Sequence, residues 1–92
     1  MNKADKQRFA ALNDIGCIVC HNLGYGYSPP EIHHLLTGSG MGQRAPNTKT
    51  IPLCPNHHRN GGYGIAIHSG QREFERRYGL ESELLEQVNR LI

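Results

Sequence analysis

The sequence predicts a small α+β domain that is held together in part by a bound metal ion. The chain has 92 residues, of which 37% are hydrophobic and none is Trp. A chain of this length can bury only a small hydrophobic core, so a further stabilising link such as a disulfide, a metal ion or oligomerisation is expected. Two strand candidates lie in the middle of the chain, and helical patterns lie near both ends. Two Cys/His pairs offer ligands for a metal. We expect a single domain over residues 1–92.

The amino-terminal segment predicts a short helix over residues 3–13. Phe9 and Leu12 lie three positions apart, and Gly16 follows as a stop. The next four residues, Cys-Ile-Val-Cys at 17–20, are expected to form a tight turn. Residues 21–30 end in a proline pair, so no helix is expected there.

The central segment predicts two strands joined by a loop. Residues 31–36 are the first candidate, and residues 50–53 are the second, which ends at Cys54. A glycine-rich run at 37–42 and a polar stretch at 43–49 separate them.

The carboxy-terminal third predicts a loop at 58–67 followed by two helices. Ser69 can cap the first, which runs to Tyr78 and ends at Gly79. The second covers residues 81–92. Its apolar stripe is either core or a dimer surface and consists of Leu84, Leu85, Val88, Leu91 and Ile92.

The cellular setting follows from what the sequence lacks. No apolar run approaches the roughly 20 residues of a membrane helix, and the first residues are polar rather than a secretory leader. An odd count of 3 Cys argues against a disulfide framework. We therefore expect a cytoplasmic protein without a membrane segment.

Two pairs with metal-ligand spacing stand out. Cys17 and Cys20 are separated by two residues, as are Cys54 and His57. Such pairs in tight turns can converge on one tetrahedral ion, and a Cys₃His set is common in structural Zn²⁺ sites. We predict a structural zinc bound by these four residues. His58 or His21 could replace His57 as the fourth ligand.

The charge distribution is compatible with nucleic acid but does not require it. The net charge is only +2. Residues 21–60 carry Arg44, Lys49 and Arg59 against the single acid Glu31. Bound metal would make this segment more positive, so the three basic residues are candidate phosphate contacts.

Four further histidines are not needed for the zinc. The segment from His33 to His58 has a characteristic order: a His-His pair, a glycine-rich loop, a strand ending in Leu-Cys, and a closing His. This order resembles the HNH, or ββα-metal (His-Me finger), nucleases. The resemblance implies a zinc-stapled ββα core over about residues 31–78, with knuckles at 17–20 and 54–57 and flanking helices.

The resemblance also implies residue roles. His34 corresponds to the general base, His33 to the metal ligand before it, and His58 to the metal-binding His that closes the motif. His68 is a further candidate ligand of the catalytic ion, Mg²⁺ or another divalent metal. The register of the family's middle Asn falls near Lys49, so the orienting partner of the base is open, with Asn47 and Asn56 as candidates.

Phosphodiester hydrolysis explains why these residue types are needed. The reaction requires an activated water, neutralisation of phosphate charge and help for the leaving oxygen. Histidine, whose ordinary pKa lies near neutrality, is suited to deprotonating water.

The likeness narrows within the HNH nucleases. Residues 30–59, with GIAIHSG and FERRYG downstream, are similar to the phage recombination-enhancement (Ref) nucleases. Those enzymes cut DNA where a RecA filament is present. The resemblance implies a DNA endonuclease of phage or prophage origin, with DNA and a RecA filament as partners.

Two other readings remain open. The same Cys₃His set, without the usual Asn, fits a non-catalytic zinc-finger module that binds DNA or protein. A phage structural protein whose zinc replaces a core is the third. The number of metal sites per chain separates the nuclease from the zinc-finger module, because only the nuclease needs a second ion. Absence of any DNA affinity would support the structural protein.

Overall fold

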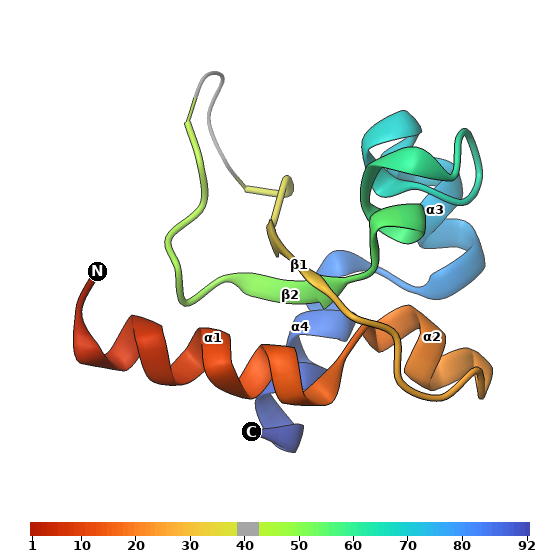
Figure 1. The fold of residues 1–92 in the computed structure, drawn as a ribbon. Coiled ribbons are helices and arrows are strands. Elements are labelled where there is room, and N and C mark those ends of the chain that lie inside the picture. The colour runs from red at the N-terminus through yellow and green to blue at the C-terminus, as the bar shows by residue number, and fades with distance from the viewer. Residues whose placement is uncertain (39–42) are drawn as a thin grey trace.

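The computed structural model describes residues 1–38 and 43–92 and confirms the predicted α+β class. Most of the predicted glycine-rich run at 37–42 therefore lies outside the described residues. The elements, in chain order (Figure 1), are α1 (Lys3–Ile15), α2 (Ile18–Leu23), β1 (Glu31–His34), β2 (Thr50–Leu53), η1 (Asn56–Asn60), η2 (Ile67–Ser69), α3 (Gln71–Tyr78) and α4 (Glu81–Leu91).

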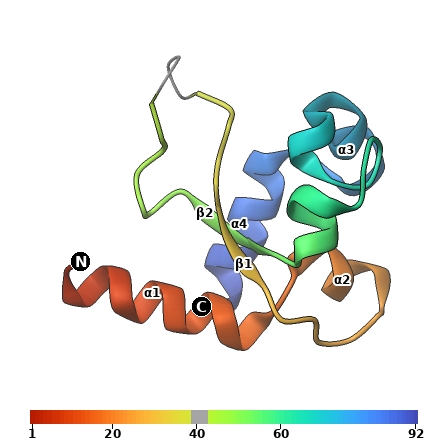
Figure 2. The ribbon, with the colours of Figure 1, turned by 45° about the horizontal axis from the view of Figure 1, so that its top comes forward.

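An antiparallel pair of strands occupies the centre of the domain. His33 lies opposite Ile51, and His34 lies opposite Thr50. All four residues of β2 are buried, and this strand contacts α1, α2 and α4. Figures 1 and 2 both show α4 behind the two strands and α1 along their lower side. The second strand is thus the axis around which the helices pack.

Helix α1 begins and ends as its local chemistry requires. The Asn2 side chain caps it by accepting from the Asp5 amide at 2.8 Å. Gly16 ends it with a φ of 78°, and a Cβ there would lie 2.8 Å from a ring carbon of Tyr27. Only glycine fits that position. The helix runs two residues beyond the predicted Asn13.

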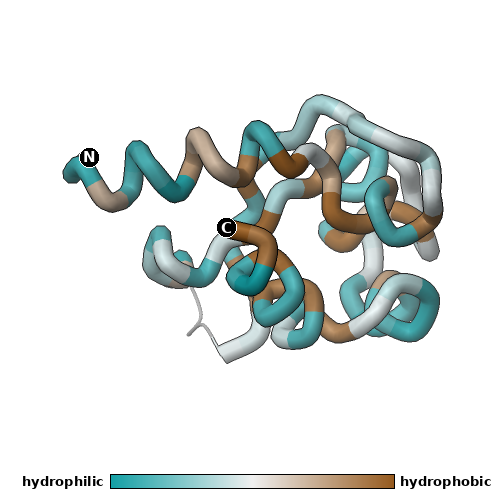
Figure 3. The backbone as a smooth tube through the Cα atoms, turned by 90° about the horizontal axis from the view of Figure 1, so that it is seen from below, coloured by the Kyte–Doolittle hydropathy of each residue, from teal (hydrophilic) through white to brown (hydrophobic). Residues whose placement is uncertain are grey.

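The hydrophobic core lies where the helices meet β2. Figure 3 shows hydrophilic residues along the first turns of α1 and hydrophobic segments where its last turn meets α2. The fully buried apolar side chains come from every layer and include Leu12, Ile18, Leu53, Phe74 and Val88. On α4, Leu84 and Val88 are buried while Leu91 and Ile92 are exposed. The predicted apolar stripe is thus only partly core.

The predicted tight turn at 17–20 is wrong. Residues Ile18–Leu23 form α2, and Cys17 occupies its N-cap, where Sγ accepts from the Cys20 amide at 3.4 Å. The helix extends into the segment 21–30, where none was expected, because the proline pair acts only on residues close to it. Helix α2 is six residues long, with Cys17 as its N-cap and Gly24 as its C-cap.

Three further boundaries differ from the prediction. The first strand ends at His34 rather than at residue 36, because the amides of Leu36 and Thr37 bond to Glu81 on α4. The expected loop at 58–67 holds part of η1, a π-helical turn, and the start of η2, a 3₁₀ turn. Ser69 does not cap α3, because it belongs to η2 and Gly70 takes the cap position.

Among the described residues, no helix combines the length and apolar character needed to cross a bilayer.

Candidate functional site

Three cysteines and one histidine from distant segments meet in the interior. Cys17 and Cys20 come from the start of α2, Cys54 follows β2, and His57 lies on η1. All four are buried, and their ligand atoms lie within 4.8 Å of one another. The structure brings His57, rather than His58 or His21, to the three thiols.

The spacing of these atoms suits a tetrahedral metal ion. Nδ1 of His57 lies 3.7, 3.6 and 3.2 Å from Sγ of Cys17, Cys20 and Cys54. The Cys20 and Cys54 sulfurs are 3.9 Å apart. Ligands about 2.0–2.3 Å from a tetrahedral ion lie roughly 3.5–3.8 Å from one another. The four side chains could therefore hold one metal ion with little movement.

Burial affects the protonation of this cluster. It raises the pKa of the Cys17 thiol to about 12, although backbone hydrogen bonds from Cys54 and Cys20 oppose the rise. Burial also lowers the pKa of His57. Since a metal binds the thiolate, binding at this cluster would release protons from the cysteines.

The π-helical turn η1 sends two adjacent histidines to two different places. His57 faces the thiols, whereas His58 points to a second cluster with His33 and His68. Single π turns are frequent at functional sites. Here the turn lets one short segment serve both clusters.

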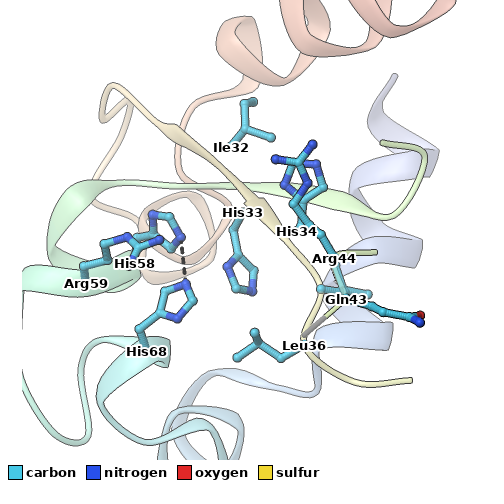
Figure 4. Close-up of a pocket in the computed structure, with 10 residues that line it drawn as sticks. Ile32, His33, His34, Leu36, Gln43, Arg44, His58, Arg59 and His68 are labelled. Carbon is cyan, nitrogen blue, oxygen red and sulfur yellow. Dashed lines mark hydrogen bonds between the residues drawn. The ribbon is translucent and has the colours of Figure 1, made fainter. Parts of the chain in front are cut away.

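The second cluster consists of three imidazoles. The ligand atoms of His33, His58 and His68 lie within 4.8 Å of one another, and the His58 and His68 Nε2 atoms are 3.1 Å apart. Their ring centroids are 4.7 to 5.2 Å apart. Figure 4 shows the three rings converging from β1, η1 and η2. We call this set the histidine trio.

Carboxylates bind the outer nitrogens of two trio members. Nε2 of His33 donates to Oε2 of Glu81 at 2.7 Å, and Nδ1 of His58 donates to Oε1 of Glu31 at 2.8 Å. Carboxylate–histidine pairs of this kind orient metal-ligating imidazoles. Nδ1 of His33 and Nε2 of His58 are left for the interior of the trio.

One nitrogen of the trio has no partner. Among the described residues, Nδ1 of His33 is the buried side-chain nitrogen or oxygen atom without a hydrogen bond. An unsatisfied buried polar atom is costly, and ligation of a metal ion is one way to satisfy it. The donor set of three imidazoles with two carboxylates behind them therefore fits a divalent cation.

The pKa values of two trio members, His58 and His68, are lowered from their ordinary value. Desolvation lowers the pKa of His58, outweighing its bond to Glu31. His68 is the exposed member of the trio, yet its pKa is lowered to about 4. Partial desolvation of its ring is the main cause, and the charges of His33 and His58 add to it. Burial by itself would raise the pKa of Glu81, but bonds from His33, Thr37 and Leu36 lower it overall. Low pKa values on His58 and His68, with an ionised Glu81 behind His33, favour a cation at the trio.

His34 lies on the other side of β1 from His33, as alternation along a strand requires (Figure 4). Its Nε2 atom is 2.9 Å from Oδ1 of Asn47, and Nδ2 of Asn47 donates to Oδ2 of Asp5 at 3.0 Å. An amide oxygen only accepts, so Nε2 of His34 carries the proton and Nδ1 keeps its lone pair. Of the two candidate partners, Asn47 contacts His34.

A cavity of about 440 Å³ joins the trio to His34. Arg44 and Arg59 line it as well, whereas Lys49 is not among its lining residues. Two of the three predicted phosphate contacts thus lie beside the histidines.

Sequence reasoning missed three residues of this region. Glu81, Glu31 and Asp5 touch His33, His58 and the His34 partner Asn47 respectively. Glu31 lies two positions from His33, so strand alternation could have placed both on one face. Glu81 and Asp5 gave no comparable signal, because acidic residues are common in the first turn of any helix.

A family model described as "Recombination enhancement, RecA-dependent nuclease" matches residues 2–92. No curated protein matches the chain.

Proposed function

The chain belongs to the recombination-enhancement, RecA-dependent nuclease family, and on that premise we propose that it is a metal-dependent DNA endonuclease of HNH type. One observation carries the proposal. Three imidazoles surround a common point at a cavity that His34 and two arginines also line. A single domain over residues 1–92 would hold the whole site.

The arrangement of β1, β2 and the following helical segment supports a ββα-metal core over about residues 31–78. The first strand supplies His33 and His34, and η1 after the second strand supplies His58. The trio of His33, His58 and His68 would hold the catalytic ion. When bound there, a divalent ion supplies charge neutralisation at the phosphate and at the leaving oxygen.

His34 acts as the general base in this proposal. Its Nδ1 lone pair accepts a proton from the attacking water, while Asn47 holds the opposite nitrogen. The water oxygen bonds to phosphorus as the bond to the leaving oxygen breaks. Arg44 and Arg59 contact the phosphate backbone, and Lys49 contacts it farther from the cut.

The thiol cluster is proposed to bind structural Zn²⁺. Three thiolates and one imidazole are a common zinc set, and the ion would tie α2 to the end of β2. Its role is to hold the strands and η1 in place rather than to take part in hydrolysis.

We propose that the histidine trio binds a transition-metal ion in preference to Mg²⁺. Mg²⁺ prefers oxygen ligands and retains its waters. Imidazole nitrogens favour ions such as Ni²⁺ and Zn²⁺. Mn²⁺ lies between these classes and is a practical activator to test.

DNA carrying a RecA filament is the proposed substrate, in line with the family description. A nicking assay on supercoiled plasmid tests the whole proposal, with and without RecA filaments and with Mg²⁺, Mn²⁺ or Ni²⁺. Replacing His34 with Ala should reduce nicking by roughly 10²–10⁴-fold, the usual contribution of a general base. His21→Ala removes an exposed imidazole outside both clusters and should nick at the parental rate.

Equal nicking by His34→Ala and the parent would reject the assignment of the base. DNA binding without any metal-stimulated nicking would instead favour the non-catalytic zinc-finger module.

A further inference from the structure

A buried carboxylate lies behind the trio, on an element that carries none of its histidines. Glu81 is the first residue of α4 and is 0% exposed. Its Oε2 atom accepts from Nε2 of His33, 48 residues earlier in the chain. A buried charge is retained only where its partners compensate for the lost solvation.

The remaining partners of Glu81 fix the orientation of its carboxylate. Its Oε1 atom accepts from the amides of Leu36 at 3.0 Å and Thr37 at 2.9 Å, and the Leu36 amide is shared with Oε2, also at 3.0 Å. Gln71 donates to Oε1 at 3.4 Å. These bonds hold Oε1 toward the backbone that follows β1, while Oε2 faces both the Leu36 amide and, at 2.7 Å, Nε2 of His33. The bonds from the Leu36 and Thr37 amides would be enough to anchor that backbone. The bond to His33 therefore requires a separate explanation.

The bond to His33 sets the tautomer of the ring. An ionised carboxylate only accepts, so Nε2 of His33 must carry the proton and Nδ1 must be unprotonated. Nδ1 is the partnerless nitrogen inside the trio. The same carboxylate that holds the ring therefore leaves a lone pair on the atom that faces His58 and His68.

We propose that Glu81 is a positioning residue that fixes the tautomer and orientation of His33 so that Nδ1 serves as a metal ligand. The proposal rests on the proposed function to the extent that the trio binds the catalytic ion. Glu81 touches neither DNA nor the ion in this scheme, and it acts only through His33.

The variant Glu81→Gln tests this. The amide oxygen of the glutamine would remain with the Leu36 and Thr37 amides, which are donors. Its NH₂ group would then face His33 and require an acceptor there. We expect the proton of His33 to move from Nε2 to Nδ1. Long-range ¹H–¹⁵N NMR spectra of the full chain, loaded with one zinc per chain, detect this change directly. Mn²⁺ affinity, measured by calorimetry, should fall by about 10–100-fold, the usual effect of losing such a partner.

Glu86→Gln is the matched control, because it makes the same change at an exposed site on the same helix. It should alter neither the His33 spectrum nor Mn²⁺ affinity. Retention of the Nε2 proton and of parental affinity in Glu81→Gln would overturn the proposal.

The wild-type spectrum decides the matter even if Glu81→Gln does not fold. A His33 ring protonated on Nδ1 in the wild-type protein would overturn the proposal, and one protonated on Nε2 supports it. Absence of nicking by the wild type would reject the nuclease assignment instead, while leaving the tautomer and the Mn²⁺ affinity measurable.

Discussion

The imidazole of His34 lies 2.9 Å from the side-chain oxygen of Asn47, and Asp5 holds the amide of Asn47 from α1. The three side chains come from β1, the loop before β2 and the first helix. A carboxylate that accepts from the amide NH₂ leaves the amide oxygen pointing at His34. The proposed base therefore has a fixed tautomer and a fixed ring orientation before any substrate binds.

Loss of this contact should slow nicking without unfolding the protein. In Asn47→Ala, the His34 ring can rotate and protonate either nitrogen, so we expect the nicking rate to fall by about tenfold or more, in line with the sensitivity of catalysis to small misplacements. Single-turnover nicking at saturating protein and metal measures this. Asn13→Ala, which removes an exposed amide from α1, should leave the rate unchanged. A parental nicking rate in Asn47→Ala would show that the contact between Asn47 and His34 does not contribute to catalysis.

Removal of the metal from the thiol cluster should unfold the domain. Structural zinc in small domains contributes apparent binding free energies of about 10–16 kcal/mol. Whole domains are stable by only about 5–15 kcal/mol. Cys54→Ser, or treatment with a strong chelator, should therefore abolish the cooperative thermal transition seen by circular dichroism. His68→Ala changes only the trio, so it should keep one zinc per chain and the transition. A chain that stays folded without metal would contradict the zinc assignment.

Arg8 should contribute measurably to stability because it joins three elements. Its guanidinium donates to the Thr50 hydroxyl at 2.9 Å, to the Thr50 carbonyl at 2.6 Å and to the Asn89 side chain at 2.9 Å. Thr50 is 0% exposed, so its oxygens cannot all turn to water. Arg8→Ala should lower the free energy of unfolding by about 1–3 kcal/mol.

Urea denaturation at fixed zinc concentration measures that loss. The exposed residue Arg90, in the last turn of α4, offers a matched arginine. Its replacement by Ala should change stability by no more than about 0.5 kcal/mol. Equal midpoints for the two variants would show that the Arg8 contacts are not stabilising.

Local sequence patterns predicted much of the fold. The second strand has the predicted bounds at residues 50–53, and Gly79 ends α3 as expected. Both depend on near neighbours in the chain: an apolar run bounded by polar residues, and a glycine free to adopt a φ of 108°. The wrong predictions arose where tertiary contacts overrode local preference. Helix α2 begins at Ile18 although the sequence of residues 17–20 favours a turn.

The sequence by itself determined which side chains could serve each cluster. Two-residue spacing brought Cys17 to Cys20 and Cys54 to His57, and alternation along β1 sent His33 and His34 to opposite sides. Only the tertiary structure decided how those histidines are held. Glu81 meets His33 across 48 residues, and Asp5 meets Asn47 across 42. Such pairs arise from the packing of α4 and α1 against the strands. Their short-range sequence context is that of ordinary acidic residues in the first turn of a helix.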